Sequence, residues 1–272
     1  MNNFLRYGRL FFALGIIALG VVCLIVGDFI VGRPPEWPAQ VAGKLAWAYI
    51  AGTLFIILGL AIILRKMAGA AALTIGAIIL IYSFLFRYLP NMIGQSFEAI
   101  LWTLNGYKTL ALAGGAFIVA ASFFGENNRG ISFRQPGSPL AANKGLVMTG
   151  IIFLSLFLIM CGCSHFKYAE FVFGLIPAYI PFHVFWTYFT AVALLAAGIG
   201  LLLPRTRKLA AALSGVMVFA WFILLHIPRF VTTPNDPSDR MGLFESLAIS
   251  GILLVLAGIT PSNPHIDPAK HN

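Results

Sequence analysis

This chain of 272 residues contains eight apolar segments, and each is about as long as a helix that crosses a lipid bilayer. Such a helix needs roughly 20 mostly apolar residues. Apolar residues make up 60% of the chain and charged residues 10%, which leaves too little polar surface to cover a water-soluble domain. The sequence therefore predicts an all-α polytopic membrane protein, with spans at residues 10–27, 46–64, 69–88, 107–123, 145–163, 184–203, 209–228 and 243–260.

Charges outside these segments indicate how the helices are oriented. An even number of spans places both termini on one face, and that face holds eleven basic residues against two acidic ones, whereas the other face holds seven of each. Cytoplasmic loops carry the excess of Lys and Arg in membrane proteins. We therefore expect both termini in the cytoplasm and the protein in the inner cell membrane. The net charge of +9 reports this topology and does not indicate nucleic-acid binding.

The two halves of the chain are similar to each other. Trp47 and Trp186 begin matching spans, and the segment KTLALAGGAFIVA at 108–120 is similar to ESLAISGILLVLA at 245–257. Four spans in each half give both halves the same orientation, which is a parallel repeat; chance similarity between helices rich in Leu, Ala and Gly is the alternative. The sequence predicts a diverged first four-helix repeat at 1–124, a cytoplasmic linker at 125–143, a second repeat at 144–262 and a cytoplasmic tail at 263–272.

Several motifs follow one another over about 50 residues of the second half. They are His165-Phe166, the spaced prolines Pro177 and Pro181, the aromatic pair Trp186 and Tyr188, Gly198 and Gly200 before a run of leucines, and the basic turn from Arg205 to Lys208. In this order they resemble the DoxX-like family of small four-helix membrane proteins. The resemblance covers about residues 145 to 260. The first half departs from it, with Asp28-Phe29 in place of His165-Phe166.

This resemblance implies an association with a respiratory or thiol redox system. The ligand stays unknown at this point, with quinone as the candidate that the resemblance implies. Beside the lipid bilayer, the candidate partners are a redox protein or a second copy of the chain. Family members are also linked to assembly or chaperone roles. The resemblance carries no set of catalytic residues, so whether the protein is an enzyme stays open.

Five polar side chains fall near span ends on the extracytoplasmic face, and they are the candidate ligand-binding residues: His165, Glu170, His183, His226 and Glu245. The ends of a helical bundle converge on one side, so these side chains are expected to lie near one another. Imidazole suits hydrogen bonding to a quinone headgroup, proton exchange near neutral pH and several transition metals. We predict no specific metal site. The alternative is that all five are ordinary residues of the membrane interface.

Two further pairs of residues stand out. Lys108 occupies the position that matches Glu245 in the repeat, and these opposite charges predict a salt bridge between the halves; two solvated span ends are the alternative. Cys161 and Cys163 are two residues apart, which is about 200° on a helix. They are therefore expected to point to opposite sides as small buried residues, with a reactive thiol as the alternative.

Three functions remain open after these observations. The first is a DoxX-like membrane protein beside a redox system, binding quinone near its extracytoplasmic face. The second is a non-catalytic membrane scaffold or assembly factor. The third is a small-molecule permease, which is disfavoured because coupled transporters keep ionisable groups near the middle of their spans and these spans carry none there.

Overall fold

The computed structural model describes residues 3–33, 35–127 and 139–261, with side chains from 125 to 142 left out, and the regular structure of these residues is entirely helical. Eight of the helices are long and apolar enough to cross a membrane, which confirms the expected number and fits an integral membrane protein. Six spans are single helices or parts of one: α1 (Asn3–Val26), α2 (Lys44–Ile63), α6 (Leu104–Asn127), α7 (Pro139–Lys167), α9 (His183–Leu202) and α12 (Pro237–Ile259).

The third span of each half is interrupted by a π-helical segment. In the first half α3 (Ala68–Leu80), η1 (Ile81–Tyr88) and α4 (Leu89–Met92) follow one another. In the second half the order is α10 (Arg207–Trp221), η2 (Phe222–His226) and α11 (Ile227–Thr232). Each π segment lies just before a proline, Pro90 or Pro228, whose ring lacks an N–H and crowds the carbonyl four residues back. Such segments are rare in proteins and often occur at functional sites.

The last span, α12 (Pro237–Ile259), begins at a side-chain cap. The Asp236 carboxylate accepts hydrogen bonds from the backbone N–H groups of Ser238 and Asp239 at 2.8 and 3.0 Å, and these are donors that have no partner inside a helix. Two short helices, α5 (Phe97–Leu101) and α8 (Ala169–Leu175), lie in segments expected to be loops.

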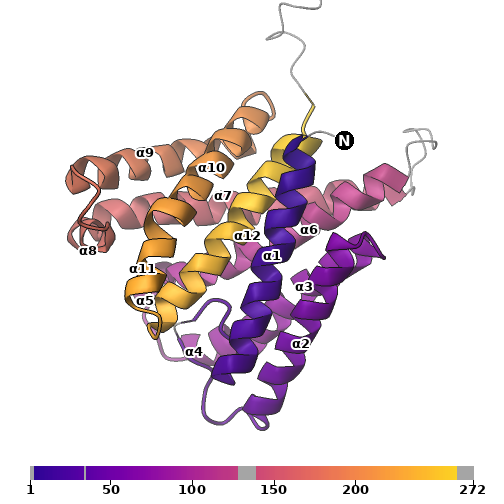
Figure 1. The fold of residues 1–272 in the computed structure, drawn as a ribbon, viewed down its shortest axis with the longest axis horizontal. Coiled ribbons are helices and arrows are strands. Elements are labelled where there is room, and N and C mark those ends of the chain that lie inside the picture. Colours follow the sequence, from indigo (N-terminus) through magenta and orange to yellow (C-terminus); the bar gives the residue numbers. More distant parts are fainter. Residues whose placement is uncertain (1–2, 34, 128–138, 262–272) are drawn as a thin grey trace, which may run out of the picture.

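The first and last spans pack side by side and antiparallel, so the start of α1 lies next to the end of α12 (Figure 1). Their backbones touch at Gly8 and Gly251, where a Cβ on Gly8 would lie 2.7 Å from the Gly251 carbonyl oxygen. The same arrangement joins α6 to α7, where a Cβ on Gly114 would lie 2.9 Å from Gly150 Cα. Small residues allow this close packing between membrane helices.

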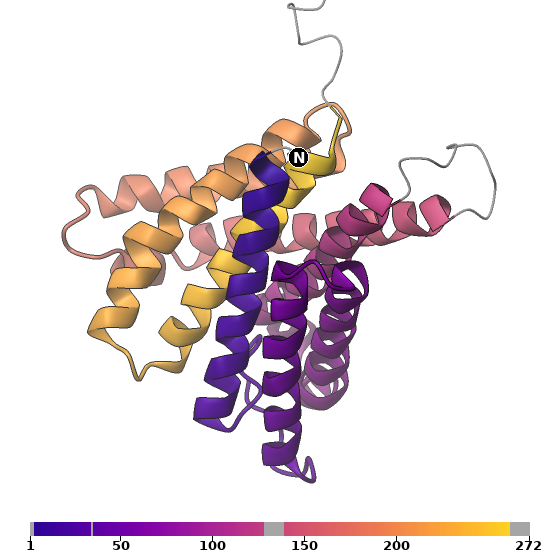
Figure 2. The same cartoon turned by 45° about the vertical axis from the view of Figure 1, so that its right-hand side comes forward.

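Helices α6 and α12 lie in the middle of the molecule and contact each other. On one side α2 and α3 complete the first half, and on the other α9 and α10 complete the second. In both Figure 1 and Figure 2, α7 and α9 run across the direction of α1 and α12. The buried core combines side chains from both halves, with α1, α6 and α12 as its largest contributors.

The expected linker at 125–143 is partly helical, because α6 continues to Asn127 and α7 begins at Pro139. Residues 128–138 and the expected tail at 263–272 lie outside the described residues.

Candidate functional site

The connection between α1 and α2 folds back into the first half. Residues 28–32 and Trp37 are buried, and we call this set the plug. The rings of Phe29 and Trp37 pack against Tyr82 of η1, with ring centroids 5.2 and 5.5 Å apart. Trp37 also meets Phe86 edge to face at 5.7 Å. The plug therefore covers the aromatic side of η1, beside Trp47 of α2, which also packs on Tyr82 and Phe86.

Two side chains of η1 bind the backbone of the plug. The Arg87 guanidinium is wholly buried and donates to the carbonyl oxygens of Phe29 and Val31. The Tyr88 hydroxyl donates to the carbonyl oxygen of Gly32 at 2.6 Å. A buried cation away from water needs such partners, because leaving it unsolvated costs several kcal/mol. These contacts hold the plug in place.

Lys108 of α6 and Glu245 of α12 form an ion pair, with 2.6 Å between Lys108 Nζ and Glu245 Oε2. The Glu245 side chain is 1% exposed, and its other oxygen accepts a hydrogen bond from the Gly32 N–H at 3.0 Å. These two residues are thus joined to each other and to the plug, and they are not solvated span ends.

The outer edge of the plug carries further charges. The buried Asp28 carboxylate lies 3.5 Å from Arg33 and 3.7 Å from Lys44. Arg33 also hydrogen-bonds Glu36, and this contact holds the pKa of the Glu36 carboxyl below its usual value.

Sequence reasoning missed two parts of this arrangement. Arg229 and Asp239 form a double contact at 2.8 and 3.1 Å, and Arg229 also donates to the Leu175 carbonyl oxygen at 3.3 Å. Their opposite charges on either side of a proline-rich turn were the available signal. The role of Arg87 was also missed, although an arginine within an apolar span is a recognised sign of a special site.

The five candidate ligand-binding residues lie on different elements. Two of them are His183, part-buried at the start of α9, and Glu170, exposed on α8. The His165 ring lies 2.8 Å from the Cys161 carbonyl oxygen of its own helix through Nδ1. In the described part of the chain no hydrogen bond or ion pair joins any two of the five, and no group of three or more His, Cys, Asp or Glu is placed to hold a metal ion.

His226 differs from the other histidines because it lies in η2 and packs against α12. A Cβ at Gly242 would lie 3.2 Å from its Nδ1 and 3.3 Å from its Cε1, so this edge of the ring faces α12. Glu245 is three residues beyond Gly242, which places it on the same side of the helix one turn away. The structure thus places His226 on the side of α12 that carries the ion pair of Lys108 and Glu245.

The cysteines are free thiols, with Cys23 buried and both Cys161 and Cys163 part-buried. Cys161 Sγ lies 4.0 Å from His165 Nδ1. The sequence predicts Cys161 and Cys163 as buried residues, and the structure leaves both partly exposed.

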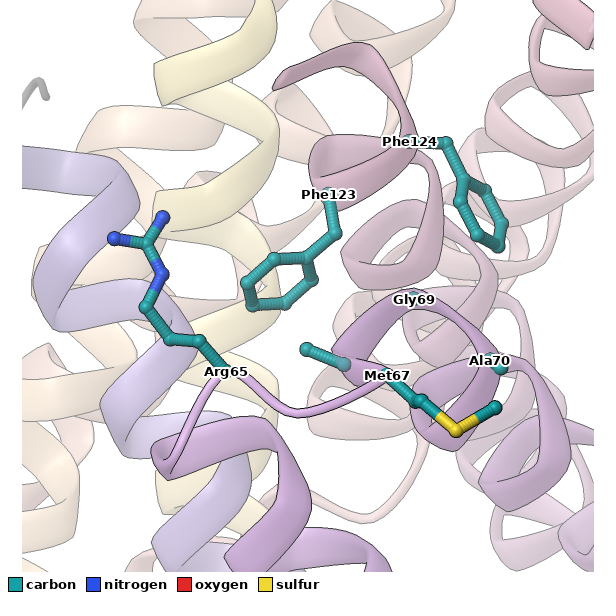
Figure 3. A pocket seen from close by; sticks show the side chains of 7 residues that line it. Arg65, Met67, Gly69, Ala70, Phe123 and Phe124 are labelled. Carbon is teal, nitrogen blue, oxygen red and sulfur yellow. The ribbon is translucent and has the colours of Figure 1, made fainter. Parts of the chain in front are cut away.

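A hollow of about 360 Å³ lies between the turn that joins α2 to α3 and the end of α6 (Figure 3). Its lining consists of Arg65, Met67, Ala68, Gly69, Ala70, Phe123 and Phe124. None of the candidate residues borders it.

One family model matches the chain, over residues 154–257, and its description is a domain of unknown function (DUF8561). No curated protein and no solved structure matches.

Proposed function

We propose that the chain is a tandem duplication of one four-helix unit, with the halves parallel and both termini in the cytoplasm. Helix contacts that recur in the same order in both halves support this. Gly20 of α1 meets Gly52 of α2, and at the corresponding place in the second half Gly162 of α7 meets Ala191 of α9. The next contact repeats as well: Gly76 meets Phe117, and Gly215 meets Leu254.

A ring contact supports the same correspondence. Trp47 and Tyr82 meet edge to face at 6.1 Å and 86°. Trp186 follows Trp47 by the same number of residues as Trp221 follows Tyr82. The rings of Trp186 and Trp221 also meet edge to face, at 5.9 Å and 85°. Chance similarity of apolar helices does not account for matched contacts of this kind, because they depend on how the helices pack and not on composition.

The duplication proposed here involves an exchange of helices between the halves. The first span of each half packs on the last span of the other, α1 on α12 and α7 on α6. Residues at matched positions of α6 and α12 then meet where these central helices cross, and Lys108 and Glu245 are such a pair. Because one copy has a Lys and the other a Glu at this position, the two side chains attract each other, whereas two identical charges would repel each other.

We further propose that the protein is a DoxX-like inner-membrane protein that works beside a respiratory or thiol redox system and binds quinone at the end of the bundle opposite the termini. His226 carries this proposal. Its ring lies in a π-helical turn within a span, one edge rests on Gly242, and its side chain makes no hydrogen bond within the described residues. A neutral imidazole N–H there can donate to a quinone carbonyl oxygen. Ionisable side chains inside membrane-spanning segments typically mark ligand or ion pathways.

Purification in mild detergent, followed by mass spectrometry of copurified lipids, tests this function. We expect quinone with the wild type, less of it with His226→Ala, and unchanged content with His165→Ala, because the His165 ring is bonded to its own helix. Elemental analysis of the same samples checks for metal. Wild-type protein without quinone, or equal quinone content in both variants, would contradict the proposal.

A non-catalytic scaffold or assembly factor is the second candidate. Phe171 and Phe182, near the end of the bundle opposite the termini, are 68% and 78% exposed, which suits docking of a protein partner. This reading predicts that the double variant Phe171→Ser/Phe182→Ser loses a specific cross-linked partner while the quinone content is unchanged. The described helices show no feature that supports the third function, a small-molecule permease.

A further inference from the structure

The two π-helical segments differ in how they are covered. In η1, Tyr82, Ser83, Arg87 and Tyr88 are buried. In η2 no residue is buried. The same position in the two halves is therefore closed in one and partly open in the other.

The preceding connections explain this difference. The plug of the first half is buried, whereas in the connection from residue 168 to 182 only Ile176 is buried. Phe171, Tyr179 and Phe182 in that connection are 68%, 59% and 78% exposed. No ring of the second connection stacks on Trp221, whose ring partner in the described residues is Trp186 of α9. The second connection does reach η2, where the Tyr179 hydroxyl donates to the Leu224 carbonyl oxygen, but none of its rings packs on Trp221 as Phe29 and Trp37 pack on Tyr82.

The open face of η2 consists of residues that match those beneath the plug. Trp221 corresponds to Tyr82, and Pro228 corresponds to Pro90, but the segment between the two is one position shorter in the second half. His226 therefore matches either Arg87 or Tyr88. Both of these side chains donate hydrogen bonds to carbonyl oxygens of the plug. His226 is thus the counterpart of a carbonyl-binding donor, whichever alignment holds.

We infer that the η2 face (Trp186, Trp221 and His226) binds a small molecule with the two features that the plug has in the first half, a flat apolar ring and a carbonyl oxygen. This inference rests on the proposed function and places its ligand, because a quinone headgroup has both features. The ring packs against Trp221, as Phe29 and Trp37 pack against Tyr82.

The orientation of the histidine agrees with this role. Its Nδ1 edge faces Gly242 of α12, which leaves Nε2 as the nitrogen turned away from that helix. Protonated at Nε2, the ring donates one hydrogen bond to the ligand oxygen. The apolar ring of the ligand would meanwhile cover tryptophan surface that is otherwise open, a contact that favours aromatic over aliphatic ligands.

Binding measured in detergent with two probes tests the inference. The probes are decyl-benzoquinone and decylbenzene, which share an alkyl tail and a six-membered ring but differ in the carbonyl oxygens. We expect the quinone to bind the wild type more tightly. His226→Phe should weaken quinone binding about tenfold, the value of one hydrogen bond of ordinary strength, and leave decylbenzene binding unchanged. His226→Gln keeps an N–H donor and should retain most of the quinone affinity.

Matched variants locate the site. His165→Phe makes the same substitution in α7 and should leave both affinities unchanged. Trp186→Leu should weaken both probes, whereas Trp47→Leu, the same change at the matching position of the plugged half, should weaken neither.

The outcomes separate the two proposals. Binding of neither probe to the wild type contradicts the proposed function itself. Equal binding of both probes that is unaffected by His226→Phe overturns this inference and identifies the face as a contact for lipid chains. Loss of affinity in Trp47→Leu and not in Trp186→Leu would also overturn it, because the site would then lie in the first half.

Discussion

Buried charges in this protein are each solvated by particular partners. Arg87 has the carbonyl oxygens of Phe29 and Val31, and Glu245 has the Lys108 ammonium and the Gly32 N–H. An ion that loses its partner at such a position stays buried and uncompensated, which costs about 3–5 kcal/mol. These residues are therefore expected to be sensitive to substitution even if they never contact a ligand.

Replacing Lys108 with Met should lower the free energy of unfolding by about 3–5 kcal/mol, because the Glu245 carboxylate would be left without its cation. The thermal unfolding midpoint in detergent measures this. Lys66→Met, at an exposed position on the turn after α2, is the control and should change stability by less than about 0.5 kcal/mol. The exchange Lys108→Glu/Glu245→Lys should recover part of the loss seen in either single variant. Failure of the double variant to recover any stability would count against a bridge between the halves.

At the scale of elements, the plug depends on long-range contacts. Its backbone is bound by η1 and α12, from residues that are 56 to 213 positions away in the chain. The plug has no regular secondary structure to stabilise it locally. The conformation of the plug is therefore held by side chains from distant parts of the chain.

Arg87→Met should release the plug, because two hydrogen bonds from a charged donor, each worth about 1.5–3 kcal/mol, are lost. Hydrogen–deuterium exchange at residues 28–32 should then rise by at least about tenfold, while exchange in α8 stays unchanged. Arg240→Met is the control, since that guanidinium binds Pro234 and Asn235 in an exposed turn. Unchanged protection of 28–32 in Arg87→Met would show that other contacts hold the plug.

Close packing of α6 against α7 gives a second prediction at this scale. Gly150→Ala inserts a methyl group against the Gly114 carbonyl and should cost about 1–3 kcal/mol. Gly145→Ala, in the same helix, has no atom within 4 Å of the added carbon and should be neutral or slightly stabilising because alanine favours helices. Thermal unfolding of the two variants in detergent checks this, and equal midpoints would contradict it.

At the scale of the whole molecule, the proposed exchange of first spans means that neither half forms a closed bundle alone. Helix α1 lies against α12, and α7 lies against α6. The described ends of the chain, the start of α1 and the end of α12, therefore lie together on one face (Figure 1). The proposed topology assigns this face to the cytoplasm because basic residues are concentrated there.

Cysteine labelling with a membrane-impermeant maleimide tests that topology in a variant without native cysteines. Asn235→Cys, in the exposed turn before α12, should react in intact spheroplasts, whereas Arg205→Cys should react only after the membrane is opened. The reverse pattern would place the termini outside the cytoplasm.

Local sequence was sufficient for several features of this protein. The number of spans follows from apolar segments of bilayer length, a property that each segment carries by itself. The ion pair of Lys108 and Glu245 joins two residues that the comparison of the two halves had already paired, since a Lys and a Glu occupy matching positions. The expected orientation, with both termini in the cytoplasm, also comes from the basic turns alone and stays a prediction.

Other features were decided only by the tertiary structure. The sequence singled out His165 because of its place in a family motif, but a helix already offers its ring a carbonyl partner four residues back. The plug, and the hydrogen bonds by which Arg87 holds it, depend on burial, which no local pattern in residues 28–37 indicates. The length of an apolar segment is a property of that segment alone, so the sequence shows it directly. The partners of a buried charge, and the exposure of η2, depend instead on which distant segments lie beside them.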